Sequence, residues 1–361
     1  MCVTPGGEII GLHQPSSEFP FHKAIFDVRP DLKAIIHAHP PALVSFSIVR
    51  KIPNTNIIPQ AKTICGPIGY AEYALPGGYE LGDKIAEQFS RGYDAVTMEN
   101  HGIVVAGTDL KDAYIRFEAL EFSARTISGA STVGTVSYLT DEQIEQFENS
   151  IPKDIPEMDQ VDYPSDELTI RTNISELVRR ACSQGLMISS YGTVSVRWYD
   201  NNFLITPKKI PRLEIGSEDI EQIKNGKREP GKLPSRALKL HEQIYKANSE
   251  VNSIILTQSP NVMAFGVSDA KLDVRTIPES WIFLQDIPVI PFGEQFTGKD
   301  TIPELISKNT PSVIIKNDSI LVTGDQLLHT FDRLEVAEFS AKSLIMSKSL
   351  GDLIPINRLR I

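Results

Sequence analysis

The sequence lacks the features that mark secreted, membrane-spanning and disulfide-stabilised proteins. Its three cysteines lie far apart at positions 2, 65 and 182 and form no CxxC pair, so neither a disulfide framework nor a zinc ribbon is indicated. No apolar run approaches the roughly 20 residues that span a bilayer. Met1 is not followed by the basic and then apolar stretch of a secretion signal. We therefore expect a cytoplasmic protein without a membrane segment.

Positive charge is also scarce. The chain has 36 Lys and Arg against 46 Asp and Glu, a formal net charge of -10, and this balance argues against nucleic acid as the main partner because phosphate binding needs a surplus of basic side chains. The remaining composition is that of an ordinary globular protein, with 41% hydrophobic and 23% charged residues. A length of 361 residues favours two domains over one.

The chain contains two related segments of domain size. Residues 116–125, RFEALEFSAR, return as residues 333–342, RLEVAEFSAK. Residues 15–22, PSSEFPFH, correspond in the same way to residues 234–241, PSRALKLH. The spacing between the copies is nearly constant, which indicates a tandem duplication of one domain rather than an array of short repeats.

The two copies differ at their start. The second copy begins near Leu168, and residues 168–219 have no counterpart in the first. In the second copy this stretch predicts a helix through residues 174–182, closed by Gly185, and strands at residues 192–198 and 202–206. The first domain must borrow these elements or do without them.

The expected domains follow from this alignment. Residues 1–149 form the first domain, which lacks its N-terminal portion, and residues 167–361 form the second. Residues 150–166 contain three prolines among acidic residues and are typical of a linker. Thr140 is expected to cap a short helix just before this linker.

Four residues of the first copy have the chemistry of metal ligands. The apolar run at residues 34–36 predicts a buried strand, and residues two apart on a strand share a face, so His37 and His39 project together. His101 lies in a turn between two apolar segments. Glu18 stands at a predicted helix start with Ser17 as the N-cap. Three imidazoles and one carboxylate are typical ligands of Zn²⁺ or a similar metal.

Each of these residues also has a purely structural interpretation, as a core histidine, a turn residue or a carboxylate at a helix dipole. Comparison of the copies favours the metal site. All four positions change together in the second copy, whereas the neighbouring Ile35, Ile36 and Asn100 have the identical residues Ile254, Ile255 and Asn317 as counterparts. Loss of all four residues in the same copy indicates that the four residues serve one function. The residues that replace Glu18, His37, His39 and His101 are Ala237, Leu256, Gln258 and Asp318.

These motifs resemble the class II aldolase and adducin head-domain family. The resemblance is carried by PSSE at residues 15–18, HAH at 37–39 and NHG at 100–102, and in the second copy by GTVSVR at 192–197 and LITP at 204–207. It implies an α/β fold, a three-layer α/β/α domain with a mainly antiparallel central sheet, present here in two tandem copies. The family's enzymes are typically homotetramers that bind Zn²⁺ through one Glu and three His and cleave or form carbon-carbon bonds in small sugar phosphates.

The resemblance also implies roles for single residues. Glu18 would be the fourth metal ligand and, once displaced by substrate, the catalytic base. Ser16 and Ser17 match positions near the substrate phosphate, although both also have a simple interpretation as helix caps. The resemblance therefore implies a zinc-dependent lyase with a small-molecule substrate, in a homo-oligomer or with the two domains paired inside one chain.

The match is incomplete on the substrate side. The family's phosphate-binding loops belong to the portion that the first copy lacks, and the tyrosine that some of these aldolases use as a proton donor would fall near Ile58. Three explanations stay open: a start site upstream of Met1, complementation by the second copy or another subunit, or a protein that keeps the metal without the aldolase reaction. The alternative function is a non-catalytic adducin-like interaction module. Adducin heads lack a working metal set, so the intact ligands favour the enzyme.

Overall fold

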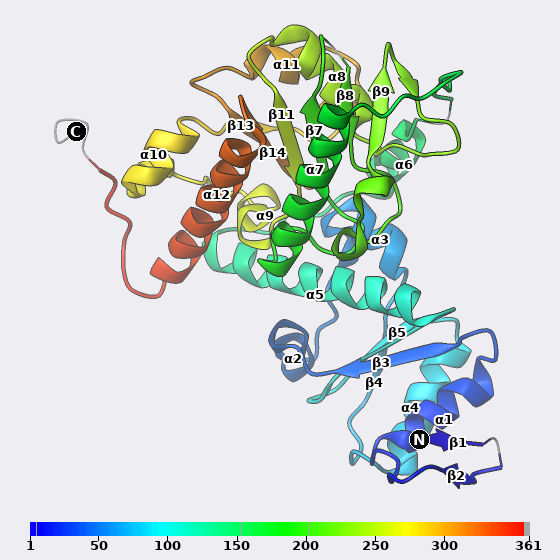
Figure 1. The fold of residues 1–361 in the computed structure, drawn as a ribbon. Coiled ribbons are helices and arrows are strands. Elements are labelled where there is room, and N and C mark those ends of the chain that lie inside the picture. Colours follow the sequence, from blue (N-terminus) through cyan, green and yellow to red (C-terminus); the bar gives the residue numbers. More distant parts are fainter. Residues whose placement is uncertain (5, 153, 201, 357–361) are drawn as a thin grey trace. The chain divides into compact units, whose positions relative to one another are not determined.

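The computed structural model describes residues 1–4, 6–152, 154–200 and 202–356, which form two compact units (Figure 1). Unit 1 comprises Met1–Thr55 and Ala61–Ala124, and unit 2 comprises Asn56–Gln60 and the described residues from Arg125 on. The division into a first domain at residues 1–149, a linker at 150–166 and a second domain at 167–361 remains a proposal based on the internal sequence repeat. Within the described part of the chain, no helix is both long and apolar enough to cross a membrane.

Unit 1 is built on a four-stranded sheet of order β3-β6-β5-β4. β3 pairs antiparallel with β6, β6 pairs antiparallel with β5, and β4 runs parallel to β5. A separate two-stranded ribbon, β1 with β2, precedes it. The elements are β1 (Cys2–Val3), β2 (Ile9–Ile10), α1 (Phe19–Val28), β3 (Ala34–Ala38), α2 (Pro41–Ile48), α3 (Pro59–Cys65), β4 (Gly69–Ala71), α4 (Tyr79–Ser90), β5 (Ala95–Met98), β6 (Gly102–Gly107) and α5 (Leu110–Val133); α3 and α5 continue into unit 2, and a 3₁₀ helix covers Thr55–Ile57.

The helices α1 and α4 cover one face of this sheet. Both have apolar residues at helical spacing, with Phe21 and Ile25 on α1 and Leu81, Ile85 and Phe89 on α4. These side chains are buried together with alternate residues of β5 and β6, namely Val96, Met98, Val104 and Ala106. Helix α2 contacts β5 and β6. Packing of helices against the sheet fixes its strands, and with them the residues at the strand ends.

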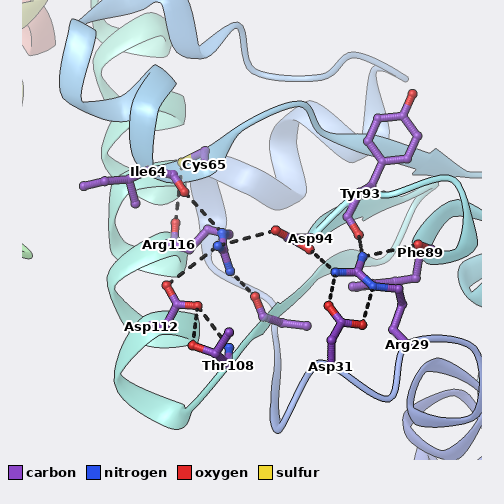
Figure 2. A network of polar contacts seen from close by, with 11 residues as sticks. Arg29, Asp31, Ile64, Cys65, Phe89, Tyr93, Asp94, Thr108, Asp112 and Arg116 are labelled. Atoms are coloured by element: carbon purple, nitrogen blue, oxygen red, sulfur yellow. Dashed lines mark hydrogen bonds and ion pairs between the residues drawn. The ribbon is translucent and has the colours of Figure 1, made fainter. Parts of the chain in front are cut away.

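A polar network joins the elements at the other end of these strands (Figure 2). Asp94, which precedes β5, accepts a hydrogen bond of 3.0 Å from Arg29 Nη2 and lies 3.5 Å from Arg116 Nη2 of α5. Arg116 also donates to the carbonyl oxygens of Ala106 and Ile64. One carboxylate thus connects the end of α1 to α5, and through Arg116 to α3 and β6.

Unit 2 contains an eight-stranded sheet of order β10-β9-β8-β7-β11-β14-β13-β12. All neighbours pair antiparallel except β12 and β13. The elements are α6 (Asp141–Ser150), α7 (Ser165–Ser183), β7 (Thr193–Arg197), β8 (Phe203–Ile205), β9 (Glu221–Lys224), β10 (Lys227–Arg228), α8 (Leu238–Ala247), β11 (Ser253–Thr257), α9 (Pro260–Gly266), α10 (Pro278–Leu284), β12 (Val289–Ile290), α11 (Thr301–Leu305), β13 (Ser312–Ile315), β14 (Ser319–Gly324) and α12 (Leu327–Ser347), with short 3₁₀ helices at Arg212–Glu214, Ser217–Asp219, Val274–Thr276 and Glu294–Phe296.

Two apolar cores lie on the two faces of this sheet, because side chains alternate along each strand. Ile255 of β11 joins a core with α7, α9, α10 and α12, and its neighbours Ile254 and Leu256 join a core with α8 and α11. The layers are therefore helix, sheet and helix, as the sequence predicts (Figure 1). The mainly antiparallel sheets confirm the expected fold class in both units.

The two units share one topology. The order β3-β6-β5-β4 of unit 1 matches β11-β14-β13-β12 of unit 2, including the single parallel pair at the end. Unit 2 continues past β11 with β7 and β8, which have no counterpart among the described residues of unit 1. The next two strands, β9 and β10, form an antiparallel pair that aligns in sequence with the ribbon of β1 and β2. The strands β7 and β8 and most of α7 lie within the stretch that the sequence alignment finds only in the second copy. The predicted helix ending before Gly185 and the predicted strands are confirmed as α7, β7 and β8.

Candidate metal centre

Three elements of unit 1 bring the predicted ligands to one end of the sheet. His37 lies on β3, and His39 follows directly after this strand. His101 lies in the turn between β5 and β6, where Asn100 adopts a left-handed conformation with φ of 53°. Glu18 is the residue that immediately precedes α1. The structure therefore brings all four predicted residues together, although they span more than eighty positions of the sequence.

The three imidazoles face one another. Their centroids are 4.6 Å apart for His37 and His39, 5.0 Å for His37 and His101, and 4.9 Å for His39 and His101. One ring nitrogen of each lies within 4.8 Å of one ring nitrogen of the other two. The Glu18 carboxylate approaches both His37 Nε2, at 3.2 Å, and His101 Nε2, at 3.8 Å. This spacing is compatible with a shared cation at the centre of the group.

The backbone selects the tautomer of His37. Its Nδ1 lies 3.0 Å from the carbonyl oxygen of Ile103. Since a carbonyl can only accept, Nδ1 carries the proton and Nε2 keeps its lone pair. This lone pair points toward Glu18. A hydrogen bond from the distal nitrogen to a backbone carbonyl is the usual way in which proteins orient a metal-binding histidine.

The polar atoms at the centre of the group fit a metal ion. Glu18 Oε2 and His37 Nε2 are buried and neither makes a hydrogen bond. Two acceptors that face each other at 3.2 Å require a proton or a cation between them. Burial lowers the pKa of His37 and of His101, in spite of the nearby Glu18 carboxylate, and so favours the neutral imidazoles that metals bind.

Gly102 allows the histidines to come this close. A Cβ atom at this position would lie 2.6 Å from the carbonyl oxygen of Ala38 and 2.7 Å from Cδ2 of His39. Both distances are far below van der Waals contact. The NHG motif therefore combines a ligand, His101, with a residue whose missing side chain leaves room for another ligand.

The two serines of the PSSE motif are exposed at the start of α1. Ser16 Oγ accepts a hydrogen bond of 3.2 Å from the backbone nitrogen of Glu18. The N-cap of α1 is Glu18 and not Ser17, because the preceding turn already adopts the geometry in which Ser16 supports the chain. The predicted cap was wrong by one residue. The consequence is that the Glu18 side chain, which makes no capping hydrogen bond, is available to the histidines.

In unit 2 the equivalent position holds an ion pair. Ala237 precedes α8 as Glu18 precedes α1, and Asp318 follows the left-handed Asn317, with φ of 51°. Asp318 is fully buried and pairs with Arg236 at 2.8 Å. Gln258 donates to the backbone oxygen of Asp318 at 2.9 Å. A guanidinium thus supplies the positive charge beside the only carboxylate among these four positions.

The sequence comparison missed Arg236. The residue aligns with Ser17, and it introduces a positive charge in the copy where Asp318 introduces a negative one. The available signal was a positive charge at the position of Ser17 together with a negative charge, Asp318, at the position of His101. Arg236 also lies 4.9 Å from the ring centroid of Phe147 on α6, a cation-π contact.

The family model of the class II aldolase and adducin N-terminal domain matches residues 1–128 and 172–345. The chain therefore belongs to this family. A 3-oxo-tetronate 4-phosphate decarboxylase of Haemophilus influenzae is 31% identical over 150 residues, which cover 40% of this chain and 69% of the relative. An L-fuculose phosphate aldolase of Methanocaldococcus jannaschii is 36% identical over 112 residues, 31% of this chain and 60% of the relative. The individual alignments thus reach about 60 to 70% of the relatives' length.

Solved structures of this family are also similar to the chain. A sugar-phosphate aldolase from Thermotoga maritima matches with 19% sequence identity and a TM-score of 0.45, over 53% of this chain and 99% of that protein. An L-fuculose 1-phosphate aldolase from Glaciozyma antarctica matches with 17% identity and a TM-score of 0.47, over 59% of this chain and 85% of that protein.

Proposed function

We propose that unit 1 binds a divalent metal ion, Zn²⁺ in the first place, through Glu18, His37, His39 and His101, and that the chain is a lyase of the class II aldolase type acting on a small sugar phosphate. The observation that carries this proposal is the convergence of three imidazoles and a carboxylate, with two buried acceptor atoms that lack a hydrogen bond. The names of the relatives, an aldolase and a decarboxylase of phosphorylated sugars or sugar acids, support the substrate class.

The residues of the site have distinct roles in this proposal. A bound divalent metal supplies Lewis acidity toward a substrate carbonyl. Neutral imidazoles from His37, His39 and His101 hold the ion without cancelling its charge. The Glu18 carboxylate would complete the ligand set of the ion, and it is the group at this site that could accept a proton from the substrate. Ser16, Ser17 and the first turn of α1 offer donors to a phosphate group.

The substrate side of unit 1 differs from that of unit 2. In unit 2 the hydroxyl groups of Thr193 and Ser235 contact each other at the start of β7. Unit 1 has Ser16 at the position of Ser235, and no described residue of unit 1 takes the position of Thr193. The second candidate is an adducin-like interaction module without catalysis, and it is favoured by the ion pair of Arg236 with Asp318 that unit 2 has where unit 1 has the candidate metal ligands.

Metal analysis of the purified chain tests the site. We expect stoichiometric zinc in the unmodified protein and its loss in the double variant His37→Ala, His39→Ala. A matched control is His13→Ala with His329→Ala, since both of these histidines are exposed and lie outside the site. Protein without metal, after growth and purification in zinc-supplemented medium, would refute the proposed centre.

Activity is tested separately with Glu18→Gln. Gln keeps an oxygen ligand but cannot take up the proton, so we expect retained metal and a loss of retro-aldol or decarboxylase activity of about 10²- to 10⁴-fold. Suitable substrates are ketose 1-phosphates and 3-oxo-tetronate 4-phosphates. A chain that binds zinc but turns over none of these compounds would favour the interaction module.

A further inference from the structure

Unit 2 has a cavity of about 830 Å³, which we call the Arg333 cavity. Its wall is formed by the end of α8, the loop that precedes β13, the end of β14 and the start of α12, with Arg333 on α12. The cavity lies at the opposite end of β14 from Asp318. Its volume is within the range of small-molecule sites, about 300 to 1,000 Å³.

The Arg333 cavity occupies the position that the polar network of Asp94 occupies in unit 1. The backbone oxygen of Asp94 accepts a hydrogen bond of 2.8 Å from β6, and that of Pro311 accepts one of 2.8 Å from β14. Arg29 follows α1 directly, and Asn248 follows α8 in the same way. Asp94 and Arg29 of the network therefore correspond to Pro311 and Asn248 of the cavity wall.

One arginine is kept at this position in both units. Arg116 donates through Nε and Nη1 to backbone oxygens of α3 and β6. Arg333 donates through the same two nitrogens, at 3.2 Å to Phe283 of α10 and at 2.5 Å to Thr323 of β14. The guanidinium groups of the two units are thus held in equivalent places by equivalent backbone contacts.

The partners of these two arginines differ. In unit 1, Asp94 lies 3.5 Å from Arg116 Nη2 and also accepts from Arg29 (Figure 2). In unit 2 the carboxylate is replaced by Pro311. The side-chain amide of Asn248 donates to backbone oxygens of α8 and α11 instead. Within the part of the chain that the structure describes, Arg333 Nη2 has neither a hydrogen bond nor an ion pair.

The other charged groups of the wall are already paired. His329 Nδ1 lies 3.0 Å from Asp325, and Lys308 lies 3.3 Å from Glu250. All four of these side chains are exposed. Burial lowers the pKa of Arg333, although the Asp325 carboxylate acts against this effect. Arg333 is therefore the cation of the wall whose charge is partly buried and not balanced by a contact.

We propose that the Arg333 cavity binds a small hydroxy carboxylate, whose carboxylate pairs with Arg333 as Asp94 pairs with Arg116 in unit 1. The equivalent place in unit 1 shows which group this arginine accepts there, a carboxylate. The cavity is large enough for a free molecule, and the exposed hydroxyl groups of Ser249 and Ser307 lie in its wall. They can bond to hydroxyl groups of the ligand.

Two further features favour an anion at this place. The cavity includes the start of α12, where the helix dipole is positive. A bound carboxylate would also restore the connection between α8, β14 and α12 that Asp94 provides between the equivalent elements of unit 1. This site does not involve the candidate metal ligands, because the residues of its wall all belong to unit 2.

The probe is D-gluconate, a six-carbon hydroxy carboxylate, titrated into the full chain by isothermal calorimetry. We expect saturable binding to one site and no binding of sorbitol, the neutral polyol with six carbons. Hydroxy carboxylates also bind metal ions, so the titration is repeated with the variant His37→Ala, His39→Ala. Gluconate should bind this variant as it binds the unmodified chain, whether or not unit 1 holds a metal.

Pro311→Asp tests the pairing with Arg333 directly. The new carboxylate would take the place that Asp94 has in unit 1, so gluconate should bind at least about tenfold more weakly, the effect of losing one charge-assisted hydrogen bond. The matched control is Thr172→Asp, which adds the same charge at an exposed position of α7 outside the cavity. Arg333→Gln removes the cation itself and should weaken binding by at least the same factor.

Four results would overturn the proposal. Absence of saturable gluconate binding would show that the cavity takes no such ligand. Unchanged affinity in Pro311→Asp, or equal weakening in Thr172→Asp, would exclude Arg333 as the partner of the carboxylate. Loss of binding in the variant His37→Ala, His39→Ala would assign gluconate to the metal centre. Inorganic phosphate that binds as tightly as gluconate would show that charge alone determines binding.

Discussion

Gly102→Ala tests whether the close approach of the strand ends builds the metal centre. The added Cβ would meet the backbone oxygen of Ala38 at 2.6 Å and the ring of His39 at 2.7 Å. The first of these atoms belongs to β3, which is held to β6 by backbone pairing. The backbone cannot rotate away as a flexible side chain would, so β3 and the His39 ring must both shift.

The expected size of the effect follows from these distances. Each contact is short of normal carbon contact, about 3.5 Å, by most of an ångström. Overpacking of this kind usually costs about 1 to 3 kcal/mol. The displaced imidazole should also weaken metal binding by about 10- to 100-fold, the range seen when support for a ligand is lost. Stability without metal and affinity for metal should therefore both decrease.

The assay combines thermal unfolding of the metal-free protein with a zinc titration against a competing chelator. Gly82→Ala is the control: its Cβ would lie 3.5 Å from Phe21, an ordinary contact, within α4. This replacement should stabilise the helix by up to about 1 kcal/mol and leave zinc affinity unchanged. If the Gly102→Ala variant has the melting temperature and zinc affinity of the unmodified chain, the close approach of the strand ends does not constrain the site.

Two further predictions concern buried charge in unit 2. Burial raises the pKa of Glu221 from 4.5 to about 8, so the folded state retains a proton that the unfolded state releases between these pH values. As pH rises through this window, the free energy of unfolding should fall by up to about 1.4 kcal/mol per pH unit relative to Glu221→Gln, as measured by urea unfolding; identical pH profiles would contradict the shift. Arg236→Ala should cost about 3 to 5 kcal/mol, because the fully buried Asp318 loses its cation. Adding Asp318→Asn should recover most of this loss, and equal melting temperatures of the single and double variants would exclude the ion pair as its cause.

Much of the architecture could be predicted from the sequence because it depends on local patterns and on internal repetition. The alternation at residues 192–198 predicts β7, and the apolar spacing from Ile174 to Cys182 predicts α7. The expected helix capped by Thr140 is α6, and the structure adds a capping box with Gln143. The helix start at Glu18 was placed one residue too early, since caps depend on turn geometry that residue types alone do not fix.

For the candidate site, the sequence by itself determined which residue types are present and, through the second copy, which of them change together. Only the tertiary structure decided that Glu18, His37, His39 and His101 meet, because their approach depends on the antiparallel pairing of β3 with β6 and on the space left by Gly102. The tertiary structure also shows that Arg236 pairs with Asp318 and that β3 pairs with β6 alone among the described strands. Local propensity acts over a few residues, whereas ligand distances and strand partners are set by packing between segments remote in the chain.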